Sequence, residues 1–168
     1  GKVRQIGLSN ETPWGTMKYL ELAETKSLPR VASIQNAYNL VNRGFEIGLS
    51  EVAMHEQVGL LAYSPLAQGT LTGKYLGGQM PQGSRLALFG DGPLMMRYKG
   101  DKTQQAIEMY VNLAKKYEID PAQLAIQFCN IQPFVTSTII GATTMEQLKT
   151  CIDSVDLDIT KEITNEIR

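Results

Sequence analysis

A loop of small residues that ends in a lysine is the stretch of this chain whose residue types most clearly suggest chemistry. It lies within Leu60–Tyr75, LLAYSPLAQGTLTGKY. Ala67, Gly69 and Gly73 leave backbone amides open to a close neighbour, and Lys74 adds a positive charge. Open amides beside a cation, at the end of a strand, favour the binding of an anion. The alternative is an ordinary strand-to-helix loop built from turn residues.

Polar residues also follow the other predicted strands, although each of these clusters could be simple capping. The carboxyl ends of parallel strands meet on one face, where α/β proteins carry their active sites. Side-chain amides can pair with a planar carboxamide, a tyrosine ring can stack, and a helix start can bind a phosphate. Together they predict a dinucleotide site. The strand-end residues are Ser9-Asn10, Gln35-Asn36, Tyr63-Ser64 and Gly141-Ala142-Thr143.

The elements that position these residues alternate between strand and helix. This alternation predicts an α/β fold with a parallel sheet and right-handed crossovers. Residues 64–100 show no regular pattern, which is typical of a functional lid or a mobile segment. The predicted strands are Val3–Leu8, Val31–Asn36, Val58–Tyr63 and Val135–Ile140. The predicted helices are Pro13 to about Lys26 with Thr12 as cap, Phe45–Gln57, one from Asp101 or Thr103, one from Asp120-Pro121, Met145–Ser154 with a Thr144/Gln147 capping box, and Thr160–Arg168.

Composition excludes several classes of protein. The 168 residues carry a net charge of −1, so no basic excess is present to bind nucleic acid. The apolar runs are strand-sized, and we expect no membrane span and no signal peptide. Cys129 and Cys151 lack metal spacing and fit reduced thiols, so we expect a cytoplasmic protein. His55 lies within a predicted helix and is interpreted as a surface residue, so the strand-end groups suit binding rather than proton transfer.

Four motifs in this order and spacing closely resemble the C-terminal half of an aldo-keto reductase, with most likeness to the Tas-like and potassium-channel-β-like branch. They are GKVRQIGLSN, SIQNAYN, LLAYSPLAQGTLTGKY and STIIGATTMEQLKT. The resemblance implies a TIM barrel that reduces carbonyl compounds with NADPH. Residues 1–168 would then be strands five to eight of the (β/α)8 barrel, since a complete barrel needs ~250 residues.

The resemblance also assigns roles to individual residues. Ser9, Asn10 and Gln35 would hydrogen-bond the nicotinamide amide, and Tyr63 would stack on the nicotinamide ring. The residues along the pyrophosphate would be Ser64, Pro65, Leu66, Ala67 and Gln68, with Lys74 as the counter-charge and Arg85 reaching the cofactor from the long loop. Gly141, Thr143 and Gln147 would surround the adenosine 2′-phosphate, whereas Thr150 and Cys151 replace the family's adenine contacts. Because Gln147 is not basic, the choice between NADP and NAD stays open.

The family's catalytic Asp, Tyr, Lys and His lie on its first four strands, and the resemblance places none of them in this chain. We therefore expect a partner, either a missing N-terminal half-barrel or a second copy of the chain, because a four-stranded parallel sheet has two unpaired edges. The substrate would be a small carbonyl compound. The alternative is a non-enzymatic half-barrel that binds a partner or itself.

Overall fold

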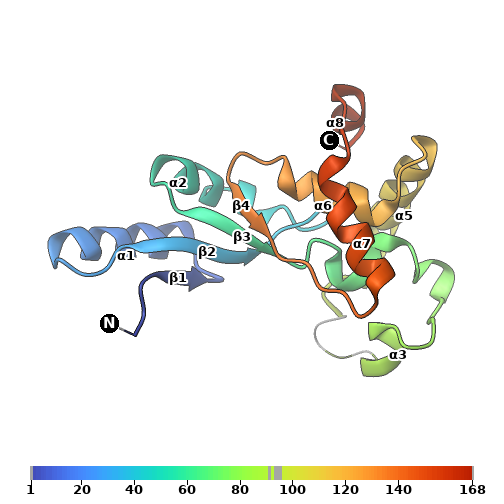
Figure 1. Ribbon diagram of the computed structural model, residues 1–168, viewed down its shortest axis with the longest axis horizontal. Coiled ribbons are helices and arrows are strands. Elements are labelled where there is room, and N and C mark those ends of the chain that lie inside the picture. Colours follow the sequence, from blue (N-terminus) through green and yellow to red (C-terminus); the bar gives the residue numbers. More distant parts are fainter. Residues whose placement is uncertain (1, 91, 93–95, 168) are drawn as a thin grey trace.

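A four-stranded parallel sheet organises the molecule. The computed structural model describes residues 2–90, 92 and 96–167. The strands are β1 (Ile6–Ser9), β2 (Val31–Ala37), β3 (Gly59–Tyr63) and β4 (Val135–Thr138). They lie in the order β1-β2-β3-β4, and every neighbouring pair is parallel (Figure 1). The predicted α/β fold with a parallel sheet is confirmed, and a sheet in chain order is consistent with part of a TIM barrel.

The first helix forms where the sequence predicts it, and the second does not. Helix α1 (Pro13–Thr25) begins with proline, and its cap Thr12 accepts a 3.1 Å hydrogen bond at Oγ1 from the Gly15 amide. The predicted continuous helix Phe45–Gln57 is instead a 3₁₀ helix, η1 (Gly44–Glu46), followed by α2 (Leu49–His55). Gly48, with φ of 86°, separates the two, because this left-handed backbone cannot continue a right-handed helix.

The stretch 64–100 contains short helices, so the prediction that it lacks regular structure is wrong in part. Its elements are the 3₁₀ helices η2 (Ala67–Thr72) and η3 (Leu76–Gly78) and helix α3 (Arg85–Phe89). Ser84 caps α3 by accepting a hydrogen bond from the Ala87 amide. Elements of three to six residues are too short to leave an apolar period in the sequence. Residues 91 and 93–95 of this stretch lie outside the described residues.

The last third of the chain follows the predicted order. Its elements are α5 (Asp101–Lys116), α6 (Pro121–Asn130), β4, α7 (Met145–Asp153), the 3₁₀ helix η4 (Ser154–Asp156) and α8 (Lys161–Ile167). Strand β4 ends at Thr138, two residues before the predicted end, although the Ile139 amide still donates a 2.8 Å hydrogen bond to the Ala62 carbonyl. Arg168, the predicted end of the last helix, lies outside the described residues.

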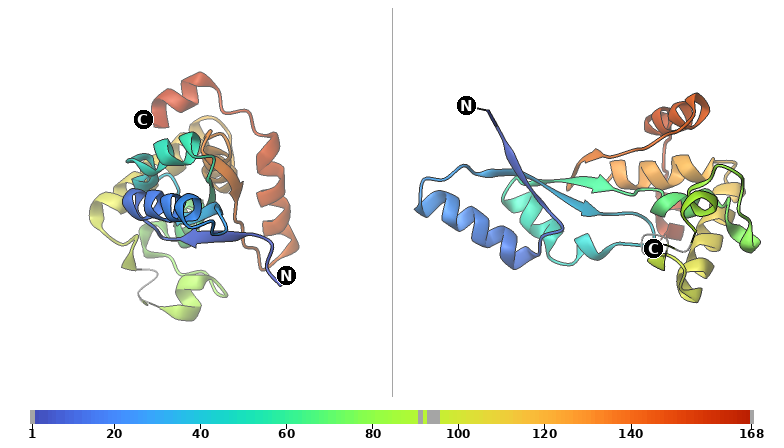
Figure 2. Two further views of the ribbon diagram at one scale, coloured as in Figure 1. Left: turned by 90° about the vertical axis from the view of Figure 1, so that its left-hand side faces the viewer. Right: turned by 90° about the horizontal axis from the view of Figure 1, so that it is seen from below.

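Helices α1 and α2 cover one face of the sheet, while α5 and α6 gather beyond the β3 carboxyl end (Figures 1 and 2). Leu60 and Ala62 of β3 and Ile34 of β2 are fully buried in the core. Along each strand, residues on the opposite face of the sheet alternate with these buried residues. Ser9 and Gln35 are exposed on that opposite face. The sheet therefore has one packed face and one open face.

No helix among the residues described here is both long enough and apolar enough to cross a membrane.

Candidate functional site

The first cluster of predicted site residues, Ser9, Asn10, Gln35 and Tyr63, comes together at the carboxyl ends of β1, β2 and β3. The Tyr63 hydroxyl donates a 2.7 Å hydrogen bond to Oδ1 of Asn10, and Nδ2 of Asn10 donates to Oγ of Ser9 at 3.3 Å. Ser9 pairs with Gln35 in the β1–β2 register. The side chains of Ser9, Asn10 and Tyr63 thus form one hydrogen-bonded group, and Gln35 adjoins it through its backbone.

The backbone holds Asn10 in an uncommon conformation that fixes its side chain. Its φ is 53°, in the left-handed region, which asparagine tolerates better than most residues. Its amide donates a 3.0 Å hydrogen bond to the Gln35 carbonyl. Asn36 does not join the cluster, since its Nδ2 donates to the Glu11 carbonyl at 3.2 Å. The Gln35 side chain is exposed at the open face and has its amide available.

The second cluster consists of Ser64–Gln68, Lys74 and Arg85 and follows β3 directly. Ser64, Ala67 and Gln68 all have positive φ, of 56°, 47° and 64°. The prediction of open amides in this segment is wrong, because the amides of Ala67, Gly69 and Gly73 donate hydrogen bonds to the carbonyls of Ser64, Leu66 and Thr70. Gln68 ties the segment together, because its Nε2 donates to Oγ of Ser64 at 3.1 Å while its Oε1 accepts a hydrogen bond from Arg85.

Lys74 folds back over this segment. A Cβ atom built on Gly69, whose φ is 92°, would lie 3.1 Å from both Cε and Nζ of Lys74. The ammonium lies 5.2 Å from the centre of the Tyr75 ring, a cation–π contact. Within the described residues, neither Lys74 nor Arg85 forms an ion pair. Two cations without carboxylate partners among the described residues therefore lie beside Gln68 and Gly69.

The third cluster, Gly141, Thr143 and Gln147, lies at the start of α7. Gln147 Oε1 accepts hydrogen bonds from the amide and hydroxyl of Thr143, at 3.0 and 3.1 Å. Oγ1 of Thr144 accepts from the Gln147 amide at 3.2 Å, which confirms the Thr144 half of the predicted capping box. The Gln147 side chain bonds one residue earlier than predicted, at Thr143. No hydrogen bond among the described residues joins this cluster to the other two.

A shallow pocket of about 340 Å³ adjoins the third cluster. Thr143 and Thr144 line it together with Ile140, Met145 and Leu148. All the residues of the third cluster are exposed, and a Cβ on Gly141 would meet nothing within 4 Å. This end of the site is an open surface rather than a closed cavity.

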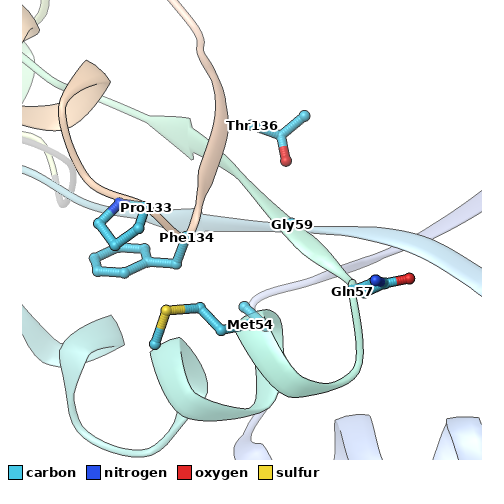
Figure 3. Close-up of a pocket in the computed structure, with 7 residues that line it drawn as sticks. Met54, Gln57, Gly59, Pro133, Phe134 and Thr136 are labelled. Atoms are coloured by element: carbon cyan, nitrogen blue, oxygen red, sulfur yellow. The ribbon is translucent and has the colours of Figure 1, made fainter.

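A second pocket, of about 410 Å³, lies at the opposite end of the strands. Met54 of α2 lies below the Phe134 ring, and Gly59 and Thr136 come from the first halves of β3 and β4 (Figure 3). No predicted site residue lines this pocket. It offers one glutamine amide and one hydroxyl but no ionisable group, so we assign it no chemistry.

Sequence reasoning missed two residues that hold the strand ends in place. Asn39 is fully buried, and its Nδ2 donates to the Ser64 carbonyl at 2.9 Å and to the Tyr98 hydroxyl at 3.2 Å. Its Oδ1 accepts from the Val41 amide at 3.1 Å. No local pattern distinguishes Asn39 from the turn asparagines around it. Tyr98 carries a weak signal, because it is an aromatic residue shortly before a helix start, at the end of a long stretch rich in glycine, proline and methionine.

A half-buried ionic cluster supports the loop after β2. Oε1 of Glu46 accepts hydrogen bonds from the Tyr38 hydroxyl at 2.6 Å and from Nε of Arg43 at 2.7 Å, and Nη2 of Arg43 donates to Oε2 at 2.8 Å. Burial raises the pKa of Glu46, but the hydrogen bonds from Arg43 and Tyr38 outweigh burial and the net pKa is lowered. Burial first, and then Glu46, raise the pKa of Tyr38.

The remaining reactive side chains lie away from the strand ends. His55 is the last residue of α2 and is exposed, as predicted. Cys129 and Cys151 are buried free thiols, and burial raises the pKa of Cys129 to about 12. Within the described residues, no group of three metal-ligating side chains comes together. The strand-end clusters can bind and orient a ligand, and they contain no general acid with a base partner.

Comparisons with known proteins identify relatives of this chain. The chain is 53% identical to Protein tas of Escherichia coli K12 over 167 residues, which cover 99% of this chain and 47% of that protein. It is 42% identical to an aldo-keto reductase of Babesia bovis over 154 residues, 89% of this chain and 53% of that protein. A probable voltage-gated potassium channel subunit beta of Oryza sativa is 37% identical over 112 residues, 66% of this chain and 34% of that protein.

The chain thus spans about half the length of the curated relatives that match nearly all of it. Both branches that the motifs suggest are among its relatives. The sequence pattern of the Aldo/keto reductase family matches residues 1–168. The family also fits the parallel sheet and the polar strand ends described above. This protein therefore belongs to the aldo/keto reductase family.

Proposed function

We propose that this chain binds NADP and is the C-terminal, cofactor-binding half of a reductase that converts aldehydes or ketones to alcohols. The observation that carries the proposal is the first cluster, in which Tyr63, Asn10 and Gln35 gather at the strand ends. Amides of this kind pair with a carboxamide, and a phenol ring lies against a planar heterocycle. When bound, NADPH supplies a hydride to the carbonyl carbon.

The second and third clusters supply groups that suit the phosphates of this cofactor. Lys74 and Arg85, which lie beside the segment Ser64–Gln68, match the charge of a pyrophosphate. Thr143 and Gln147 at the start of α7 would hold the adenosine 2′-phosphate. The 2′-phosphate is the group that distinguishes NADP from NAD, and here it would meet only uncharged hydroxyl and amide groups.

The proton donor and the rest of the barrel would come from outside residues 1–168. The described histidine, His55, is exposed at the far end of α2, and no acid–base pair lies at the strand ends. We propose that a preceding half-barrel, or a second copy of the chain, pairs with the open edges of β1 and β4. Two buried free thiols fit a reductase that works in the reducing cytoplasm.

Isothermal titration with NADPH and NADH tests the proposal. The folded protein should bind NADPH saturably, and Lys74→Met should weaken binding by about tenfold and reduce its dependence on salt. Lys18→Met, which removes a cation from the exposed surface of α1, is the matched control and should bind as the unaltered protein does. Equal affinity for NADH would overturn the NADP preference while leaving dinucleotide binding intact.

The same samples test the partner. Light scattering after size exclusion should give the mass of an assembled barrel, either a dimer of this chain or its complex with a preceding half. A folded protein that binds neither dinucleotide would overturn the proposed function. If it also had the mass of a dimer, it would be a half-barrel that functions as a binding module.

A further inference from the structure

Ser64, the residue directly after Tyr63, has a backbone conformation that serine rarely adopts. Its φ is 56°, in the left-handed region, and a residue stays there only where its surroundings hold it. The Ser64 carbonyl accepts two hydrogen bonds, from the Ala67 amide at 2.9 Å and from Nδ2 of Asn39 at 2.9 Å. The Tyr63 carbonyl accepts one from the Tyr38 amide at 3.3 Å. The peptide groups on both sides of Ser64 are therefore held.

Asn39 provides the side-chain bond in this set, and only one orientation of its amide satisfies its neighbours. The residue is fully buried. Nδ2 donates to the Ser64 carbonyl at 2.9 Å and to the Tyr98 hydroxyl at 3.2 Å. Oδ1 accepts from the Val41 amide at 3.1 Å. A flipped amide would place Oδ1 against the Ser64 carbonyl oxygen, and two acceptors cannot pair. The orientation of this side chain is therefore fixed.

These hydrogen bonds lead from the end of the long stretch after β3 to the first cluster. Tyr98, which is 2% exposed, accepts from Asn39, and Asn39 donates to the Ser64 carbonyl. Tyr63 precedes Ser64 in the chain, and its hydroxyl donates to Oδ1 of Asn10 at 2.7 Å. One buried carboxamide thus connects the loop after β2 with the turn from which the Tyr63 ring projects.

We propose that Asn39 is a positioning residue for the cofactor site and acts on Tyr63 through the Ser64 carbonyl. Its amide holds the turn that ends β3 and thereby keeps the phenol where it can bond to Asn10. The consequence for NADPH rests on the proposed function, in which the Tyr63 ring lies against the nicotinamide. A ring that is already in place loses less conformational freedom on binding, so the affinity depends on a buried side chain that would not touch the cofactor.

The side-chain amide of Asn10 reports the position of Tyr63 without any cofactor. Its NMR signals, observed in the full chain with ¹⁵N-labelled asparagine, depend on the hydrogen bond to Oδ1. Tyr63→Phe removes that bond and gives the reference positions of the freed amide. Asn39→Asp keeps an acceptor for the Val41 amide but turns an oxygen toward the Ser64 carbonyl. In Asn39→Asp, the Asn10 signals should therefore move toward the positions found in Tyr63→Phe.

Three further variants separate positioning from stability. Asn39→Ala removes the bond without burying a charge and should move the Asn10 signals in the same direction, so it gives the same test if Asn39→Asp does not fold. Tyr98→Phe keeps the bond to the Ser64 carbonyl and should move the signals less. Ser154→Ala is the matched control, because it removes the hydrogen bond of another fully buried side chain, in η4. It should lower the midpoint of thermal unfolding and leave the Asn10 signals in place.

Two results would overturn the proposal. One is a set of unchanged Asn10 signals in an Asn39 variant that circular dichroism shows to be folded. The other is an equal movement of these signals in Ser154→Ala, which would make them a measure of general stability. Movement in Tyr98→Phe as large as in Asn39→Asp would likewise count against the bond to Ser64 as the cause.

Isothermal titration with NADPH keeps this test apart from the proposed function. Asn39→Asp should weaken binding by about tenfold, whereas Ser154→Ala should bind as the unaltered protein does. If NADPH binds equally well to folded Asn39 variants, the positioning role is overturned. If the unaltered protein does not bind NADPH while its Asn10 signals still respond to Asn39, only the proposed function is overturned.

Discussion

The Tyr63 hydroxyl donates a 2.7 Å hydrogen bond to Oδ1 of Asn10, which lies 53 residues earlier in the chain. Tyr63 ends β3 and Asn10 follows β1, so the bond crosses the end of β2 between them. This hydrogen bond fixes the orientation of the Asn10 side-chain amide, with Oδ1 as the acceptor and Nδ2 as the donor. A ligand carboxamide would meet an oriented partner rather than a rotating one.

Removing this hydroxyl should weaken cofactor binding without unfolding the protein. Tyr63→Phe keeps the ring and frees Asn10, so we expect the Kd for NADPH to rise several-fold, in line with the loss of about 1 kcal/mol for one hydrogen bond. Tyr63→Ala also removes the ring and should bind more weakly still. Isothermal titration measures both, with Tyr19→Phe on the exposed surface of α1 as control. Unchanged affinity in Tyr63→Ala would remove this residue from the site.

Gly69 should be needed for the position of Lys74 as well as for the turn. A left-handed alanine costs about 1–2 kcal/mol, so Gly69→Ala should lower the free energy of unfolding by that amount and displace the lysine. Gly78→Ala is the matched control, because its φ is 78° and a Cβ there meets nothing. Chemical denaturation should show similar losses for both variants, and only Gly69→Ala should weaken NADPH binding. Equal effects on binding would argue against a role for the lysine contact.

The Glu46 cluster should give stability a defined pH dependence. The folded-state pKa of Glu46 lies below its ordinary value of 4.5, so its contribution is present above pH 4.5 and lost as the pH falls. The pKa of Tyr38 is raised above 10.0, so its contribution is present below pH 10 and lost as the pH rises through the higher folded-state value. Denaturation midpoints measured across pH should show both losses.

Substitution of the carboxylate should remove the acid side of that profile. Glu46→Gln should cost about 1–3 kcal/mol at neutral pH, because Arg43 and Tyr38 lose a charged acceptor, and should flatten the decline below pH 4.5. Glu21→Gln, which opens an exposed pair with Lys18, is the control and should change stability little. A decline that persists in Glu46→Gln would assign the acid sensitivity to other carboxylates.

Asn39 should be among the most costly polar residues to replace. Its carboxamide makes three hydrogen bonds in a fully buried position, and each buried group left unpaired costs about 1–3 kcal/mol. Asn39→Ala should lower the unfolding free energy accordingly and make the 64–100 stretch more sensitive to protease, since Tyr98 loses its partner. Asn42→Ala, in the same turn, should do neither. Protection from protease in Asn39→Ala would contradict the proposed anchoring.

The sheet could be predicted because its signals are local. Buried parallel strands such as β3 read as short apolar runs, and the Thr12-Pro13 and Asp120-Pro121 pairs mark helix starts directly. The break at Gly48 and the short elements within 64–100 could not be predicted, because helices of three to six residues leave no apolar period in the sequence. Glycine in a helix pattern marks a break only when its φ is known.

The first cluster could be predicted from the rule that strand ends converge, since Ser9, Asn10 and Tyr63 follow or end strands and Gln35 lies near the end of β2. The residues that support this cluster could not be predicted. Asn39 and Tyr98 lie 59 residues apart, and their hydrogen bond depends on how a long loop returns to the sheet. Tertiary packing of this kind leaves no spacing in the sequence, so the pair of Asn39 and Tyr98 could be recognised only from the structure.

The strand order β1-β2-β3-β4 equals the order in which the chain is synthesised. Each strand after the first therefore docks against the strand made just before it, with its crossover helix already available to cover the joint. Folding during synthesis can then advance one strand–helix unit at a time, and each new edge is occupied by the next unit soon after it forms.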